Sequence, residues 1–298
     1  MVIEPIDNCN IKDYKEFVTG TFGDNIVAFG AKIDNKACGI IISEEVEESL
    51  AKAKNVWGIK NILVDEAHRR QGIGSKLVNT IILKLLSKPC RRIEVNYSCD
   101  KEMLDILRAF FLKCGFSDLQ VLSVIYRFTG DIFNKSSAVR SAIANSFKIP
   151  DNIKILPIEQ VDKRLFEKIV NKDGIDYPDN LSPFSNEFHL KSINTFCALN
   201  EKDEVIGWLT GLAGDDDLIV YRSFFVREDY RHLAIGFFLY NACIKNHFDN
   251  FQDRDGMCSI SIKNKDTERL MSLYFKNAYK FKKFEFYTCL IKIKEDDD

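Results

Sequence analysis

A glycine-containing stretch, residues 64–75, has the composition of an anion-binding loop between a strand and a helix. Apolar residues lead into it, as in a short buried strand, and others follow at helical spacing, at Ile73, Leu77, Ile81 and Leu85. The first turn of a helix carries unpaired N–H groups and a partial positive charge. Because Gly72 and Gly74 lack a Cβ, an anion can approach this backbone closely. The stretch therefore predicts a phosphate or pyrophosphate site.

Two widespread phosphate-binding patterns do not fit this stretch. A dinucleotide fingerprint requires a third glycine where Leu77 stands, and the P-loop string G-x-x-x-x-G-K followed by Ser or Thr is absent from the sequence. An ordinary glycine-rich turn between a strand and a helix remains the structural alternative.

The stretch resembles the acetyl-CoA loop of the GNAT superfamily of N-acetyltransferases. That signature has Gln or Arg, then Gly three residues later, then Gly or Ala two residues after that, and Arg69, Gly72 and Gly74 fill it. In the family, the donor's pyrophosphate binds the loop and its pantetheine arm lies along the preceding strand. The resemblance implies a donor site made of Ile62, Leu63, Val64, Arg69, Arg70, Gln71, Gly72, Ile73, Gly74 and Ser75.

The chain carries the same pattern twice. Four segments of the first half reappear in the same order in the second half, namely 3–7 at 155–159, 64–69 at 226–231, 72–74 at 234–236 and 111–116 at 274–279. Four matches in register indicate two copies of one domain.

Both halves alternate predicted strands and helices in the order of GNAT proteins, with hairpins first and β-α-β-α-β behind. The predicted fold class is α/β (α+β), with two tandem GNAT-like domains, each a mixed, mostly antiparallel sheet flanked by helices. We place the N-terminal domain at 1–130, a linker at 131–152 and the C-terminal domain at 153–298. The pattern predicts helices over 10–22, 73–87, 102–113, 136–147, 162–171, 235–248 and 267–275.

The two copies differ at the donor loop. In the second copy Ala234 stands where the family has glycine, and a methyl group there crowds the backbone and penalises a positive φ. His232 and Leu233 replace the polar Arg70 and Gln71. We therefore expect the first copy to bind acetyl-CoA, and the second to bind it poorly or not at all.

The copies differ in the opposite sense at the expected acid. Many GNAT enzymes place a tyrosine four residues before a glycine, where it protonates the leaving thiolate. Phe111 holds that place in the first copy and cannot donate a proton, whereas Tyr274 holds it in the second. The alternatives are another donor in the first copy, such as Tyr97, Ser98, Cys99 or water, catalysis in the second copy, or donor binding without turnover.

No general base is evident next to the loop. No carboxylate lies within residues 57–64, whereas Glu94 is on the following strand and Glu44, Glu45 and Glu47 are in a charged segment ahead of the donor strand. Any of them can act through a water molecule, and each is also read as an ordinary surface charge.

Composition excludes several classes of protein. The chain has 298 residues and a net charge of -2, which gives no electrostatic case for nucleic acid or an anionic membrane. Its nine cysteines form no C-x-x-C pair, and its four histidines have no metal-ligand spacing. With no signal peptide and no apolar run of membrane-spanning length, we expect a cytoplasmic protein with reduced thiols and no metal.

The predicted function is an acetyl-CoA-dependent N-acetyltransferase that acts on a primary amine of a small molecule or a peptide. The alternative is a non-catalytic acyl-CoA-binding or sensor protein, suggested by the missing tyrosine and base. A further possibility makes the second copy a domain that shapes the acceptor pocket of the first.

Overall fold

The computed structural model describes most of the chain in ten segments. These are residues 1–18, 20–46, 55–129, 148–170, 177–178, 181–183, 192–214, 217–265, 267–269 and 279–291, without the side chains of 163, 166, 167 and 170. The predicted helix at 136–147 and most of that at 267–275, including Tyr274, lie outside the described residues.

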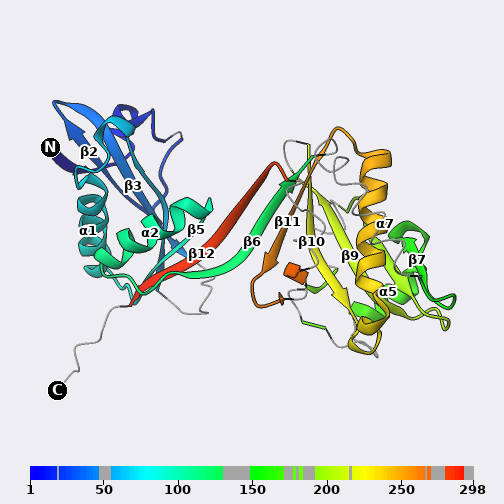
Figure 1. The fold of residues 1–298 in the computed structure, drawn as a ribbon. Helices are drawn as coiled ribbons and strands as arrows, with labels where there is room; N and C mark the ends of the chain where they lie inside the picture. The colour runs from blue at the N-terminus through cyan, green and yellow to red at the C-terminus, as the bar shows by residue number, and fades with distance from the viewer. Residues whose placement is uncertain are drawn as a thin grey trace, which may run out of the picture. The chain divides into compact units, whose positions relative to one another are not determined.

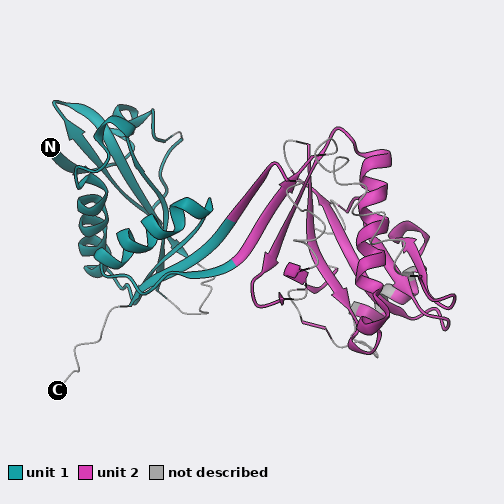
Figure 2. Ribbon diagram, in the orientation of Figure 1, with its two compact units in different colours: residues 1–122, 284–298 teal, residues 123–283 magenta. Residues whose placement is uncertain are grey.

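The chain divides into two compact units, residues 1–122 with 284–298 and residues 123–283 (Figure 2). Unit 1 has the strand order β1-β2-β3-β4-β5-β12, and unit 2 has the order β6-β11-β10-β9-β8-β7. In each unit one pair of neighbours is parallel, β4 with β5 and β10 with β11, whereas β1–β2, β2–β3, β3–β4, β5–β12, β6–β11, β7–β8, β8–β9 and β9–β10 are antiparallel. The same mostly antiparallel arrangement of strands in both units confirms the predicted fold class.

Unit 1 contains most of the elements in the first half of the chain (Figure 1). Its elements are β1 (Val2–Pro5), η1 (Ile11–Tyr14), β2 (Ile26–Ile33), β3 (Lys36–Val46), β4 (Val56–Val64), η2 (Glu66–His68), α1 (Ile73–Leu86), β5 (Arg92–Cys99) and α2 (Lys101–Lys113). Two further strands, β6 (Gln120–Phe128) and β12 (Phe281–Ile291), each contain a boundary between the two units.

Unit 2 repeats this order. Its elements are β7 (Lys154–Pro157), η3 (Ile158–Gln160), α5 (Lys163–Val170), β8 (Phe196–Leu199), β9 (Val205–Ala213), β10 (Leu218–Val226), η5 (Glu228–Leu233), α7 (Ile235–Asn250) and β11 (Asp255–Ser261).

The main core of unit 1 lies between one face of its sheet and the helices α1 and α2. The apolar stripe of α1 is completely buried there, and Phe111 of α2 packs beside Phe116 and Phe286. Trp57 in β4 and Ile93 and Val95 in β5 belong to the same core. The helix α1 is thus held against the strands that flank the glycine loop, which fixes the position of its N-terminus.

The two repeats exchange their last strands. The last strand of the first repeat, β6, pairs with β11 of unit 2, where Tyr126 lies opposite Cys258. The last strand of the second repeat, β12, pairs with β5 of unit 1, where Phe286 lies opposite Tyr97. Boundaries at 1–130 and 153–298 would keep each last strand in its own repeat, whereas the division into units falls within β6 and within β12. Periodicity predicts a strand but not which sheet it joins.

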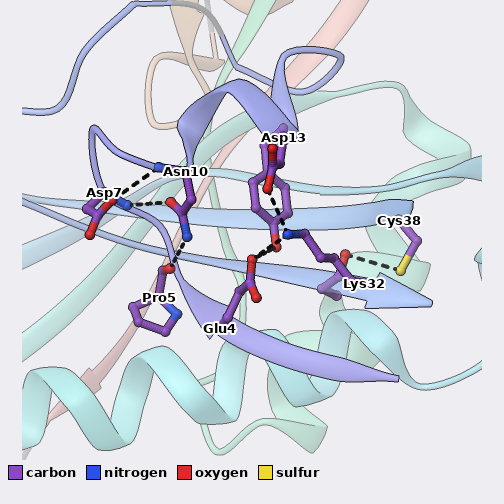
Figure 3. Close-up of polar contacts among 9 residues, drawn as sticks. Glu4, Pro5, Asp7, Asn10, Asp13, Lys32 and Cys38 are labelled. Carbon is purple, nitrogen blue, oxygen red and sulfur yellow. Dashed lines mark hydrogen bonds and ion pairs between the residues drawn. The ribbon is translucent and has the colours of Figure 1, made fainter. Parts of the chain in front are cut away.

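The helix predicted over residues 10–22 is wrong, because among the described residues of this range only η1, a single 3₁₀ turn, is helical. The Asp7 carboxylate accepts from the N–H groups of Cys9 and Asn10, so side chains compete with helical bonding. The ammonium of Lys32 lies 2.8 Å from Glu4 and 2.9 Å from Asp13, which ties the turn to β1 and β2 (Figure 3).

The strand exchange predicts that a change in the last strand of one repeat destabilises the unit built mainly from the other repeat. Phe286 and Phe128 are each fully buried, in unit 1 and unit 2 respectively, and each unit has one tryptophan, Trp57 or Trp208. Phe286→Ala should destabilise the unit that Trp57 reports by about 3 kcal/mol, and Phe128→Ala the unit that Trp208 reports by a similar amount. Denaturant unfolding in single-tryptophan backgrounds measures both. The reverse pattern would show that each repeat keeps its own strand.

A buried histidine in unit 2 couples stability to pH. His247 is fully buried, its Nε2–H donates to the carbonyl of Arg254 at 3.0 Å, and its Nδ1 accepts from the Tyr221 hydroxyl at 2.7 Å. Burial lowers the pKa of His247 below its ordinary value of 6.5, against smaller opposing effects of its bond to Arg254 and of Asp255. The folded protein therefore holds this imidazole neutral.

Unit 2 should lose stability as the pH falls below 6.5, because His247 binds a proton in the unfolded chain at a pH where it is still neutral in the folded protein. Above that pH the contribution is fully present. Denaturant unfolding followed by Trp208 across this range checks the slope, and His247→Gln should make it shallower. An equal slope in that variant would contradict the assignment.

Candidate functional site

The loop after β4 presents free backbone donors. Arg70 and Gly72 have φ of 64° and 80°, which turns the chain sharply ahead of α1. Among the described residues, no backbone carbonyl accepts from the N–H groups of Gln71, Gly72, Ile73 or Gly74. These donors lie at a helix N-terminus, where an anion is favoured.

The loop is held to the donor strand by Arg69. Its Nε donates to the carbonyl of Val64 at 3.1 Å, and its guanidinium lies 3.9 Å from Glu66. The side-chain amide of Gln71 donates to the carbonyl of Ala67 at 3.3 Å. A Cβ added to Gly72 would meet no atom within 4 Å, so the space above this residue is open.

The predicted donor strand has a free edge beside the loop. The last pair between β4 and β5 is Ile59 with Val95, although β4 continues to Val64 and β5 to Cys99. A bulge at Lys60 marks the parting, because Ile59 and Asn61 face consecutive residues of β3. The main-chain groups of β4 beyond the bulge are therefore not taken up by β5.

The side chains on this part of β4 alternate. Ile62 and Val64 pack against the core, whereas Leu63 is 42% exposed. At the start of α1, Ile73 is buried, and Ser75 interacts with Cys114, whose thiol pKa is raised mainly by burial and lowered slightly by this contact. Ten predicted donor-site residues, 62–64 and 69–75, thus form one continuous strand-loop-helix segment.

The second loop has the same anchor and a different winding. Arg231 Nε donates to the carbonyl of Val226 at 3.1 Å, which repeats the contact between Arg69 and Val64. Here η5 continues as a 3₁₀ helix up to Leu233, and the N–H of Ala234 bonds to the carbonyl of Arg231 at 3.3 Å. Residues 231–234 thus take up backbone donors that the first loop leaves free.

Ala234 adopts the left-handed conformation of Gly72, with φ of 57°. The sequence predicts that a positive φ at this position is unfavourable for alanine. Ala234 nevertheless adopts a positive φ, so its backbone is sterically strained in the folded protein.

The candidate acids occupy very different surroundings. Phe111 is 1% exposed and serves as a core residue. The Tyr97 hydroxyl is buried and has no hydrogen-bond partner in the described part of the chain, and burial raises its pKa. Ser98 is exposed and points to the other face of β5. Tyr274 lies outside the described residues.

The candidate bases also differ in their exposure and in their hydrogen-bond partners. Glu44 is partly exposed and accepts from the Asn25 amide at 3.1 Å, Glu45 is exposed, and Glu47 lies outside the described residues. Glu94 is only 6% exposed, and the Tyr287 hydroxyl donates to it at 2.9 Å. Sequence reasoning missed Tyr287, because the contact joins positions from opposite ends of the chain.

Two classes of site find no support in the described residues. No group of three or more His, Cys, Asp or Glu side chains there could hold a metal ion. Each helix in the same segments falls short of the length and apolar character needed to cross a membrane.

Comparison with known proteins agrees with the repeat. A sequence model of the acetyltransferase (GNAT) family matches residues 5–116 and 159–274. No curated protein sequence matches the chain.

Three solved structures have a similar fold. A tandem GNAT protein from the clavulanic acid biosynthesis pathway covers 96% of this chain and 97% of its own at 10% identity and a TM-score of 0.57. A glucosamine N-acetyltransferase region of a fungal multi-domain β-N-acetylglucosaminidase gives 12% identity and 0.55, over 96% of this chain and 38% of that one. An N-acetyltransferase from Sphaerobacter thermophilus gives 12% and 0.50, over 94% and 88%. At these identities the likeness establishes the fold alone.

The matched left-handed positions predict opposite effects of glycine and alanine. Ala234→Gly should stabilise unit 2 and Gly72→Ala should destabilise unit 1, each by about 1 kcal/mol, because only glycine adopts this φ without steric strain. Unfolding followed by Trp208 or Trp57 measures the two changes. A loss of stability in Ala234→Gly would mean that the residue is not strained.

Proposed function

Because the chain belongs to the GNAT family of acetyltransferases, which are acyltransferases that use acetyl-CoA, we propose that it transfers the acetyl group of acetyl-CoA to a primary amine of a small molecule or a peptide. Residues 5–116 and 159–274 carry the family match. All nine cysteines are free thiols, which supports the cytoplasm as the place of action.

The observation that carries the proposal is the open loop of unit 1 beside the free edge of β4. The N–H groups of Gln71, Gly72, Ile73 and Gly74 are available to the pyrophosphate of acetyl-CoA, and Arg69, Arg70 and Ser75 stand beside them. Over Ile62, Leu63 and Val64 the edge of β4 that faces away from β3 is not paired with β5, so its main-chain groups are available to the amide-containing arm, apart from the Val64 carbonyl, which accepts from Arg69. The exposed Leu63 side chain offers apolar cover beside that edge.

Tyr97 is the proton donor that we assign to the leaving thiolate. It lies two positions after Val95, the last residue of β5 that pairs with β4, and on the same face of the sheet as Phe111, which holds the position of the acid in the family. An unpaired buried hydroxyl is unfavourable, so this group gains a partner when a sulfur or a water molecule reaches it. Ser98, which is exposed on the opposite face, is a weaker candidate, and Tyr274 would require chemistry in unit 2.

A second candidate function is binding of an acyl-CoA without turnover, as in a sensor. The burial of Phe111 in the acid position favours it, because this side chain can only pack. Release of the free thiol of coenzyme A in the presence of primary amines separates the two, since a sensor releases none.

Binding of acetyl-CoA should depend on Gly72 and not on Ala234. A branched side chain in Gly72→Val strains the left-handed backbone and projects into the open space above the loop, so we expect about a 100-fold loss of affinity by calorimetry. The matched control, Ala234→Val, should bind acetyl-CoA like the natural chain. Equal losses in both variants, or a loss only in the control, would move the donor away from unit 1.

Removal of the Tyr97 hydroxyl should separate activity from stability. Tyr97→Phe leaves the ring contact with Phe286 and removes an unpaired buried group, so unit 1 should gain about 1 kcal/mol in unfolding experiments. If Tyr97 protonates the thiolate, kcat should fall about 10-fold while affinity for acetyl-CoA is kept, a modest loss because water can also protonate a thiolate. Unchanged kcat would exclude Tyr97 as the acid.

A further inference from the structure

A buried carboxylate on β5, the strand that separates from β4, accepts a hydrogen bond from a tyrosine hydroxyl on β12. Glu94 in β5 is 6% exposed, and Tyr287 in β12 donates to its Oε1 at 2.9 Å. The guanidinium of Arg92 lies 3.7 Å from the same oxygen. Burial of a carboxylate is unfavourable unless such partners compensate for it, so this group is held in a defined position.

The pair lies where β4 and β5 separate. Glu94 is opposite Gly58, one position before the last pair of the two strands, and Tyr287 is opposite Asn96, the first residue of β5 beyond that pair. Because side chains alternate along a strand, Glu94 and Tyr97 lie on opposite faces of β5. The carboxylate therefore stands on one side of the parting and the unpaired Tyr97 hydroxyl on the other.

Unit 2 has no such pair at the equivalent positions. There the last pair of β10 with β11 is Tyr221 with Cys258, and Met257 precedes it at the position equivalent to Glu94. Ile125 of β6 lies opposite Ser259, the next residue of β11, at the position equivalent to Tyr287. Neither Met257 nor Ile125 can accept or donate a proton. The unit with the wound loop thus also lacks the carboxylate and the hydroxyl, although the strand geometry is the same.

We propose that Tyr287 and Glu94 form a proton relay that takes the proton of the acceptor amine in unit 1. This assignment rests on the proposed acetyl transfer. The amine lone pair forms the N–C bond to the acetyl carbon, and the C–S bond breaks with its electron pair on the sulfur of coenzyme A. Before that bond forms, the ammonium form of the acceptor passes a proton to the Tyr287 oxygen while the Tyr287 proton passes to Glu94, and after it forms the nitrogen loses a second proton to water. The thiolate takes its proton from the Tyr97 side or from water.

The relay makes one site from both repeats. Glu94 belongs to the first repeat, whereas Tyr287 reaches it on the exchanged strand from the end of the second. The acceptor side of the site in unit 1 is therefore complete only when β12 is in place.

The test uses the full chain with acetyl-CoA and three primary amines, a diamine, an amino sugar and a tripeptide with a free N-terminus. Glu94→Gln should lower kcat/KM about 100-fold at neutral pH, and Tyr287→Phe should lower it less, because a water molecule can bridge to the carboxylate. Both deficits should shrink as the pH approaches the pKa of the amine, since a free amine needs no base. Met257→Leu and Ile125→Val, the matched changes in unit 2, should leave turnover unchanged.

The outcomes distinguish the relay from the proposed function. Folding of each variant is checked by Trp57 fluorescence, and binding of acetyl-CoA by calorimetry, with unchanged affinity expected for both relay variants. Turnover in the natural chain together with full activity in Glu94→Gln and Tyr287→Phe, or with a deficit that is independent of pH, overturns the relay alone. Failure of the natural chain to bind acetyl-CoA or to release thiol overturns the proposed function, and the relay with it.

Discussion

The early end of the pairing between β4 and β5 is the constraint on which the candidate site depends. The two strands share hydrogen bonds only up to Ile59 and Val95, and then each continues on its own. Backbone polar groups left without a partner are unfavourable unless water or a ligand satisfies them. The bulge at Lys60 starts this separation, the packing of α1 fixes the loop that follows β4, and the carboxylate of Glu94 stands at the same level on β5.

The two repeats provide an internal comparison of a common scaffold. Both have the parting strands, the bulge, the arginine that bonds to the last strand carbonyl and a left-handed residue before the helix. They differ in whether the loop is open, at residues 70–74, or wound, at residues 231–234, and in whether acid–base groups or apolar side chains stand at the parting. The two units thus differ at the positions that would contact a ligand, and they agree at the positions that maintain the fold.

Local sequence patterns predict much of this structure. The glycine loop, its strand and its helix follow from hydrophobic periodicity, and the left-handed Gly72 and Gly115 stand where only glycine is unstrained. The predicted helix at 10–22 fails because Asp7 and Asn10 bond to nearby backbone, which periodicity does not reveal. The strand exchange and the contact of Glu94 with Tyr287 were out of reach, since both join segments that are far apart in the chain and either repeat offers a suitable edge.

Amide hydrogen exchange with and without acetyl-CoA tests the central claim most directly, because it reads the free backbone donors themselves. We expect acetyl-CoA to slow exchange across residues 61–75, most of all at Gln71, Gly72, Ile73 and Gly74, and to leave residues 223–236 unchanged. Slowing at residues 223–236 with none at 61–75 would contradict the assignment of the donor to unit 1.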